Sequence, residues 1–509
     1  MSLPRRSHLL VAATVVLGIA LWAHVASPAK APAGGPPRGL HPGLPAVVTK
    51  AGAGQAAYDD FAWQLFIDLN WPARPDGKPD LSKIIGQAPE DPRVWDFFTD
   101  TTEIFHSSSL CADQKASPKL KVLRMYRQTT ASGLDVQAGS SWPLVDQNQN
   151  FAPVEIVVND VQKGYIAGNG LTTPDGLKKY IEHHSIVFPQ GSMEVKAAWR
   201  LFPANTDPRI LARYHTKNAV ICVAGPQSES GQPYSLKGTI GLVGLHIVYK
   251  TSSQPRWIWS TFEQVDNEEI SYKPLPGLKP TFSDGKSTSG CTSETNRPPS
   301  PVPASHELYK WSSTQPTAHI YSPTQAARCA NETDLPAAVN AEFQKALAQV
   351  PGVPNSPWQY YRLVATQWFD SHDHLQPKNS DGVAVSRNST LETYLMGDQT
   401  IAGQVPAIGP VVFKPPYPPA NSTLTDTIQA TVVAADGPAG PYTWSSCVVC
   451  HEMAAYQFGP DPTTTKDRVM TDFSFLFRSN LTAGDAAPAS EKEDPKKKNW
   501  LSTKSSRPN

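Results

Sequence analysis

Three residues near the end of the chain have the types and the spacing needed to hold a haem. They form the pattern Cys447-Val-Val-Cys450-His451, and Trp444 stands shortly before it. Two thiols at this spacing can add to the two vinyl groups of one porphyrin, and the histidine that follows can offer a ring nitrogen to the iron. The pattern predicts one covalently bound haem c, with Cys447, Cys450 and Trp444 as haem-binding residues and His451 as the proximal iron ligand.

Two other chemistries use a pair of cysteines at the same spacing. A dithiol redox motif accompanies a βαβ pattern, and no such pattern leads into Cys447. A structural zinc site needs two more ligands, and the chain has no second C-x-x-C and no H-x-x-x-H. Haem attachment is the interpretation that uses both cysteines and the histidine.

The sixth iron ligand is not set by this pattern. Met453 is too close to His451 to reach the opposite face of a porphyrin, and Met470 is the nearest plausible thioether. A thioether suits electron transfer, so we predict Met470 as the distal ligand, with His246 in an apolar strand as the alternative. A distal position without a protein ligand would instead favour catalysis. Further options are Met193 and Met396.

A second group of residues resembles a metal-binding loop. Asp370-Ser-His372-Asp-His374 places two imidazoles and two carboxylates close together in the sequence. No distant third ligand can be named, so we interpret the segment as a solvated turn after a strand. Glu182-His183-His184 is interpreted in the same way.

The N-terminus predicts export. Arg5-Arg6 precede an apolar run from Leu9 to Trp22, and Ser27-Pro28-Ala29 offers a cleavage site. We predict a signal peptide over residues 1–29 and a periplasmic protein; if uncleaved, residues 9–25 would anchor it to the inner membrane. In that oxidising compartment the remaining cysteines should form two disulfides of undetermined connectivity. These cysteines are Cys111, Cys222, Cys291 and Cys329.

The charge balance argues against nucleic-acid binding. The 45 Lys and Arg residues equal the 45 Asp and Glu residues, so the formal net charge is zero. The chain has no G-x-G-x-x-G, P-loop or G-x-S-x-G element, which leaves nucleotide cofactors and serine-hydrolase chemistry without support. The expected partner is a redox protein or a small electron donor or acceptor, with membrane contact only if the N-terminal segment is retained.

Periodic stretches predict the elements that must position the haem motif. Apolar residues at helical spacing predict two helices, the second capped by Asp334. Alternating and apolar runs predict strands, two of which form a hairpin. The helices are Tyr58–Asn70 and Leu335–Val350; the strands are Met193–Leu201, the hairpin pair Ile240–Lys250 and Arg256–Val265, and Trp358–Phe369.

The expected fold class is α+β, a single large strand-rich domain over residues 56–485 with few helices and long Pro-rich loops. A linker rich in Pro, Ala and Gly precedes it over residues 30–55, and a disordered charged tail follows over residues 486–509. Little apolar chain surrounds the motif, so the haem should be embedded in this domain near its C-terminus. Leu242–Val248 and Trp257–Phe262 are expected to form one of its walls.

Six stretches of the chain resemble exported bacterial proteins that are identified as members of the cytochrome c family. They are Phe61–Pro72, Glu194–Trp199, Gly241–Val248, Trp257–Phe262, Asn388–Tyr394 and Asp472–Phe475. The resemblance covers most of residues 56–480 and implies export and a bound haem. It leaves the reaction open.

Two functional interpretations follow from these observations. In the first, the protein is an exported mono-haem c-type cytochrome that carries electrons or serves as a redox subunit, with both axial positions filled. In the second, it is a haem enzyme, a peroxidase- or oxygenase-like oxidoreductase, with an open distal site. The sequence identifies no catalytic residue and favours the carrier, because one haem cycles one electron.

Overall fold

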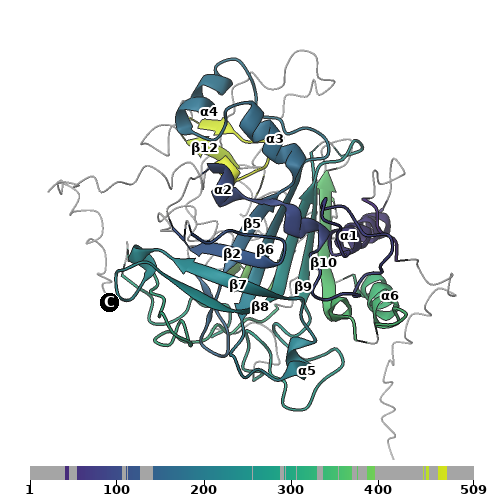
Figure 1. Cartoon of the computed structure of the whole chain (residues 1–509), viewed down its shortest axis with the longest axis vertical. Coiled ribbons are helices and arrows are strands. Elements are labelled where there is room, and N and C mark those ends of the chain that lie inside the picture. Colours follow the sequence, from purple (N-terminus) through teal and green to yellow (C-terminus); the bar gives the residue numbers. More distant parts are fainter. Residues whose placement is uncertain are drawn as a thin grey trace, which may run out of the picture. The chain divides into compact units, whose positions relative to one another are not determined.

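A nine-stranded sheet runs through the described part of the chain (Figure 1). The strands of this sheet are β1 (Thr99–Asp100), β2 (Leu120–Met125), β5 (Val154–Val158), β6 (Met193–Leu201), β7 (Thr216–Val223), β8 (Tyr234–Tyr249), β9 (Ile258–Gln264), β10 (Tyr361–Phe369) and β11 (Leu375–Gln376). The structure is a computed structural model, and it describes residues 40–44, 54–105, 110–111, 113–125, 142–254, 256–286, 292, 294–304, 307–328, 336–353, 355–369, 375–376, 387–395, 447, 451, 454–457 and 468–477.

Strand β8 is the centre of the sheet. Along one edge it pairs with β6, and along the other it pairs first with β7 and then with β9. The full order is β1-β5-β6-β8-β9-β10-β11, with β2 attached to β7. Every pairing in this sheet is antiparallel except that of β2 with β7.

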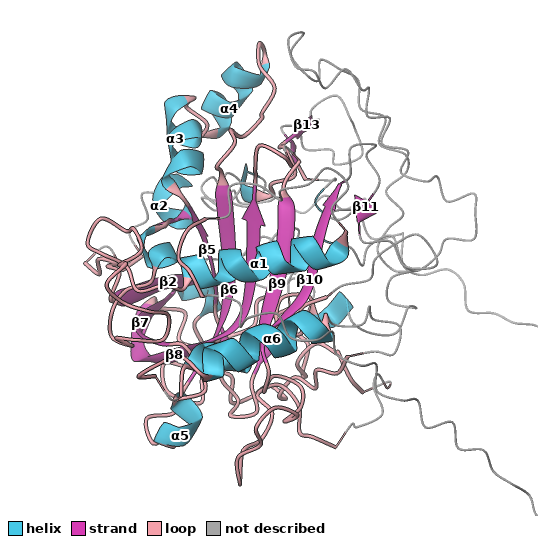
Figure 2. Ribbon diagram, turned by 90° about the vertical axis from the view of Figure 1, so that its right-hand side faces the viewer, coloured by secondary structure: helices cyan, strands magenta, loops and turns pink. Residues whose placement is uncertain are grey.

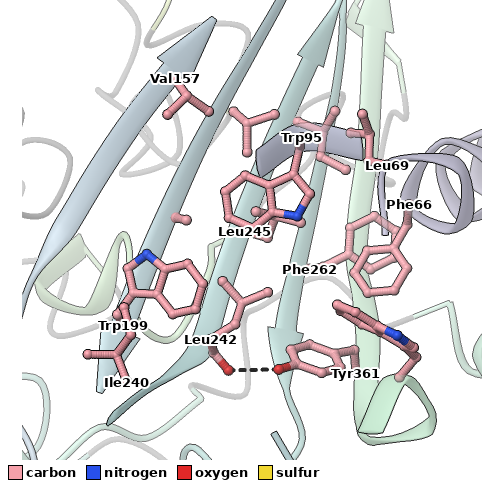
Figure 3. Packing of buried hydrophobic residues seen from close by; sticks show 14 of the residues in the cluster. Phe66, Leu69, Trp95, Val157, Trp199, Ile240, Leu242, Leu245, Phe262 and Tyr361 are labelled. Carbon is pink, nitrogen blue, oxygen red and sulfur yellow. Dashed lines mark hydrogen bonds between the residues drawn. The ribbon is translucent and has the colours of Figure 1, made fainter. Parts of the chain in front are cut away.

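One face of the sheet carries the larger apolar core. Helices α1 (Gln55–Leu69) and α6 (Ala337–Ala348) lie across this face (Figure 2). Trp63 and Phe66 of α1 are fully buried against Phe262 of β9. Figure 3 shows Phe66 beside Phe262, and also the hydrogen bond from the Tyr361 hydroxyl to the carbonyl of Leu242, which is 2.9 Å long.

A buried asparagine joins the two helices to the sheet. Its side-chain oxygen accepts hydrogen bonds from Trp63 Nε1 and from the amide of Leu363, and its side-chain nitrogen donates to the carbonyl of Leu363. This residue, Asn340, lies beside the irregularity between Leu363 and Ala365 in the pairing of β10 with β9. It therefore satisfies backbone groups at a point where the regular ladder is interrupted.

The remaining elements are short. The helices are α2 (Thr101–Phe105), α3 (Asp160–Gly168), α4 (Pro174–Ile181) and α5 (Pro208–Leu211), and the 3₁₀ turns are η1 (Val94–Phe97), η2 (Gly225–Gln227), η3 (Pro357–Tyr360) and η4 (Thr393–Leu395). Two small sheets pair β3 (Leu144–Val145) with β4 (Phe151–Ala152) and β12 (Ala455–Gln457) with β13 (Arg468–Met470).

A polar segment, residues 387–395, covers the part of the opposite face that carries Gly244 and Glu263. Gly244 of β8 has no side chain, and a Cβ there would collide with the hydroxyl of Thr390. Glu263 of β9 is fully buried on this face, where it accepts hydrogen bonds from Arg328, Arg362 and the amide of Ser389. A buried carboxylate needs such partners, so this network holds the segment on the sheet.

The α+β fold class is confirmed: the described chain is a mixed, sheet-rich structure with few helices. Strand Met193–Leu201 has the bounds that its alternation predicts, and the first helix is shifted by a few residues. The predicted starts of two strands, Trp358 and Ile240, are wrong. Trp358 lies in η3 rather than in a strand, because Pro357 fixes a helical turn before β10. Strand β8 begins at Tyr234, because its first half gains a ladder with β7.

Several predictions fall outside the described residues. They are the signal peptide over 1–29, the anchor over 9–25, the tail over 486–509 and the cap Asp334. Within the described residues, no helix has the length and apolar character needed to cross a membrane. The domain boundaries remain predictions.

One of the two expected disulfides is present. Cys111 and Cys222 are bonded, with their Cα atoms 6.1 Å apart, and Cys222 is fully buried in β7. The bond ties the segment before β2 to the strand with which β2 pairs. Cys291 and Cys329 lie outside the described residues.

This bond leads to a stability prediction. It closes a loop with a sequence separation of 111 residues, so Cys111→Ala should lower the free energy of unfolding by about 4 kcal/mol. Urea unfolding of both proteins measures the difference. The neighbouring Leu110→Ala keeps the bond and should cost less than half as much; equal losses would show that the disulfide does not stabilise the fold.

Candidate functional site

The imidazole of His451 is oriented by a backbone carbonyl. Its Nδ1 lies 2.6 Å from the carbonyl oxygen of Phe473, which can only accept, so Nδ1 carries the proton. The ring also packs against Trp259 and Phe475, at centroid distances of 5.9 and 5.1 Å. In this tautomer Nε2 keeps the lone pair. This tautomer is the one that binds a metal through Nε2.

The Phe473 carbonyl belongs to a strained turn. Asp472 and Phe473 both have left-handed backbone angles, with φ of 51° and 64°, which side chains other than Gly rarely adopt. Three groups hold the turn: Lys250 Nζ and the amide of Phe188 each lie 2.7 Å from Asp472 Oδ2, and Trp257 Nε1 donates to the Asp472 carbonyl at 3.0 Å. Lys250 and Trp257 flank the connection from β8 to β9, so the sheet fixes the direction of the carbonyl.

Cys447 packs against an apolar cluster. The cluster combines Trp257, Trp259 of β9 and Tyr456 of β12 with residues of α3 and α4, and Val248 packs against it as well. Figure 1 shows β12 close to α3 and α4. The two stretches expected to form a wall are Leu242–Val248 and Trp257–Phe262. They contribute Val248, Trp257 and Trp259 to the group of apolar residues that also includes Cys447.

His246 lies on the same face of the sheet and is bound to a carboxylate. Its Nε2 is 2.5 Å from Glu392 Oε1, and Glu392 Oε2 accepts the amide of Asn388 at 2.7 Å. Burial acts to raise the pKa of Glu392, but the charge and hydrogen bond of His246 outweigh it and hold that pKa below its ordinary value. Because Nε2 is engaged, His246 has only Nδ1 to offer to an iron.

The electrostatics favour a neutral imidazole at His451. Burial lowers its pKa to about 4, the hydrogen bond to Phe473 opposes this, and the charges of His246 and Lys196 lower it further. A neutral imidazole keeps the lone pair that a metal requires.

Met470 is placed by the small β12–β13 sheet. Ala455 pairs with Met470, and Tyr456 pairs with Val469. Tyr456 and Val469 face the apolar cluster around Cys447, so Met470, one residue on, points to the opposite side of the hairpin. This register makes Met470 less suited to be the distal iron ligand. The identity of that ligand stays a prediction.

Other candidates are not brought into the site. Cys450, Trp444, Met396 and the segment 370–374 lie outside the described residues. His183 and His184 are exposed, and Met193 is buried in the core on the helical face. No cluster of three or more His, Cys, Asp or Glu side chains suited to a metal occurs in the described ranges.

The described residues fit a covalently held haem. His451 offers an oriented, neutral ring nitrogen, and a cysteine lies beside an apolar wall. Trp259 adds a buried indole nitrogen that has no acceptor among the described residues. An apolar ring with a metal at its centre and carboxylate groups at its edge would satisfy all three features.

Comparison of the chain with protein-family models, with curated proteins and with solved structures found no match. Within the chain itself, five of the six stretches that carry the resemblance noted above meet on this face of the sheet. They contribute Glu194 and Lys196, His246 and Val248, Trp257 and Trp259, Asn388 and Glu392, and Asp472 and Phe473.

Sequence reasoning missed the residues that orient His451. Asp472 and Lys250 are far apart in the chain, and only their pairing reveals a role. The one available signal was the Asp472–Phe475 stretch, which is among the six stretches that carry the resemblance but to which no role was assigned. Glu392 and Glu194 were missed for the same reason: each is a single carboxylate whose partner comes from a distant element.

Glu194 yields a prediction about pH. It lies on β6, hydrogen-bonded to Gln162 and Ser474, and burial raises its pKa to about 7 from 4.5. Between these two values the unfolded chain is ionised while the folded chain keeps its proton, so stability falls as pH rises through the window. Glu194→Gln should escape this loss and gain about 3 kcal/mol relative to the unmodified protein between pH 4 and pH 8.

Urea unfolding of both proteins at a series of pH values measures this gain. Glu307→Gln changes an exposed glutamate and is the matched control, which should run parallel to the unmodified protein. If the stability of Glu194→Gln also ran parallel to that of the unmodified protein across this pH range, the Glu194 carboxyl would be ionised in the folded state and the prediction would be wrong.

Proposed function

We propose that the protein is an exported mono-haem c-type cytochrome that acts as an electron carrier or redox subunit. In this proposal Cys447 and Cys450 hold the haem through thioethers, Trp444 packs against it, and His451 is the proximal ligand. The observation that carries the proposal is the hydrogen bond of 2.6 Å from His451 Nδ1 to the Phe473 carbonyl. Metal-ligating histidines almost always donate their second ring nitrogen in this way.

The surroundings of His451 are suited to a redox centre. When bound, the haem supplies an iron that takes up and releases one electron. The chain contributes a fixed ligand direction, because the Asp472–Phe473 turn is tied to Lys250 and Trp257. It also contributes apolar walls that exclude water. A rigid ligand and a dry site keep the reorganisation that accompanies electron transfer small.

The setting of the protein follows from the same proposal. Thioether attachment takes place in the exported compartment, which agrees with the predicted signal peptide and the Cys111–Cys222 disulfide. The partner would be a redox protein or a small electron donor or acceptor, because the balanced charge offers no attraction to nucleic acid.

A second candidate is favoured by one observation. The His246–Glu392 pair places a hydrogen-bonded imidazole and carboxylate on the face that also carries His451. Paired groups of this kind move protons in enzymes. A peroxidase- or oxygenase-like oxidoreductase with an open distal site would use them; a carrier would not.

The attachment residues give a direct test. Changing both Cys447 and Cys450 to Ala should abolish covalent haem, because no thioether sulfur remains. Haem staining of denaturing gels after export measures this, and Cys111→Ala is the matched control that should keep the stain. A haem band that persists in the double variant would contradict the proposal.

The axial ligands decide between the two candidates. We expect the reduced, purified protein to show the spectrum of a six-coordinate c-type haem and to be unchanged by carbon monoxide. Met470→Ala and His246→Ala should then reveal the distal ligand, since only the variant that lacks it should bind carbon monoxide. Binding by the unmodified protein would favour the enzyme.

A further inference from the structure

The core on the helical face contains a buried guanidinium whose hydrogen bonds go only to neutral acceptors. Arg93, the residue before η1, is 2% exposed. Its two NH groups donate to the carbonyls of Gln87 and Ala88, at 3.4 and 3.0 Å, and its Nε has no hydrogen-bond partner among the described residues. A buried arginine is almost never left without an anion, because carbonyls satisfy its hydrogen bonds but not its charge.

The charged groups nearest to Arg93 balance one another without it. Lys217 forms an ion pair with Asp96, and Lys121 lies 3.4 Å from Asp96 and 3.0 Å from Glu155. The Asp96 carboxylate also accepts the backbone amide of Arg93 at 2.7 Å. Two lysines and two carboxylates cancel, so the guanidinium of Arg93 is left as an excess positive charge.

The pKa of Arg93 reflects the same imbalance. Burial lowers it to about 10, and the charges of Asp96 and Asp91 oppose this shift without restoring the ordinary value. Asp91 is itself engaged, because its carboxylate lies 2.7 Å from Lys83 Nζ. The protein groups that surround the guanidinium therefore do not compensate the loss of its hydration.

Three further buried polar atoms near Arg93 lack a hydrogen-bond partner within the described ranges. They are Trp358 Nε1, His215 Nε2 and the Ser356 hydroxyl. The guanidinium carbon of Arg93 lies 5.9 Å from the centre of the Trp358 ring, and the His215 ring stacks on the same indole at 4.7 Å. Ser356 packs against Gly86, next to the two carbonyls that accept from Arg93. The unpaired atoms thus gather around one indole.

The electrostatic environment of His215 is positive as well. Burial lowers its pKa well below the ordinary value, and the charges of Lys217, Arg93 and Lys121 lower it further. The ring is therefore neutral, and it can carry its proton on Nε2. A negatively charged acceptor would pair the unpaired donors and compensate the excess charge at the same time.

We propose that four side chains enclose a binding site for one small inorganic anion of the size of chloride: Arg93, His215, Ser356 and Trp358. The ligand has to be small, because none of the four is more than 3% exposed. The bound anion would join the residue before η1 to η3 and to the start of β7. The inference is independent of the proposed function, since Trp358 belongs to the core on the helical face and His451 contacts the opposite face.

The dependence of stability on chloride tests the site. An anion that binds only the folded chain raises the ratio of folded to unfolded protein as its concentration passes the Kd. Urea unfolding of the full chain is measured in sodium chloride and in sodium gluconate at equal ionic strength, because gluconate is too large for the site. We expect the ratio to rise with chloride and to be about tenfold higher at ten times the Kd.

Trp358→Phe should lose most of this gain, because it removes a donor to the anion. Trp63→Phe is the matched control: Trp63 is also fully buried on the helical face, but its indole nitrogen donates to Asn340 at 3.1 Å. The control should be less stable than the unmodified protein in both salts and should keep the full chloride gain. Ser356→Ala carries the comparison if Trp358→Phe does not fold.

The outcomes decide between an anion and ordered water. Equal stability of the unmodified protein in chloride and gluconate would overturn the site, and water would then be the partner of the unpaired donors. An equal chloride gain in Trp358→Phe and Trp63→Phe would overturn it too, because it would reflect a general effect of the salt. Diffraction from crystals grown in sodium bromide gives a direct measurement: we expect an anomalous peak within hydrogen-bond distance of Trp358 Nε1, and a map without that peak would contradict the proposal.

Discussion

The candidate site depends on a buried ion pair between Lys250 and Asp472, whose charged atoms lie 2.7 Å apart. Asp472 and its neighbour Phe473 both have left-handed backbone conformations, which cost free energy. The ammonium group of Lys250 offsets the desolvation of the Asp472 carboxylate, and the hydrogen bond from the Phe188 amide is needed as well, because a buried ion pair stabilises a fold only when its remaining polar groups are also satisfied. Removing either partner would leave a buried charge and loosen the turn whose carbonyl orients the His451 imidazole.

The two faces of the sheet carry different kinds of residue: one carries the larger apolar core, and the other carries the titratable groups of the candidate site. On the helical face, Trp63 and Phe66 pack against β9, and Asn340 satisfies the backbone at a break in the ladder. The opposite face carries charged and titratable groups such as Glu194 and His246, each with a partner from another element. Because side chains alternate along every strand, one set of strands serves both purposes.

The sequence predicted features that depend on local periodicity. Met193–Leu201 was found as a strand because its alternation is uninterrupted, and α1 because its apolar residues recur at helical spacing. The spacing alone also singled out Cys447 and His451 as haem residues, and their role stays a prediction. The tautomer of His451, the pairing of Lys250 with Asp472 and the direction of Met470 depend on distant contacts or on register, which no short window of sequence contains. The turn at Trp358 was missed because aromatic residues favour strands and Pro357 overrode them.

The ion pair also constrains the order in which the chain assembles. Lys250 and Asp472 are separated by 222 residues, and contacts of such range form only after the entropy of closing the intervening loop has been lost. The hairpin of β8 and β9, in contrast, joins neighbours in sequence. We therefore expect the strands that receive the C-terminal segment to form before that segment docks. Under the proposed function, Cys447 and Cys450 would stay accessible to the enzymes that attach the haem until this last stage of folding.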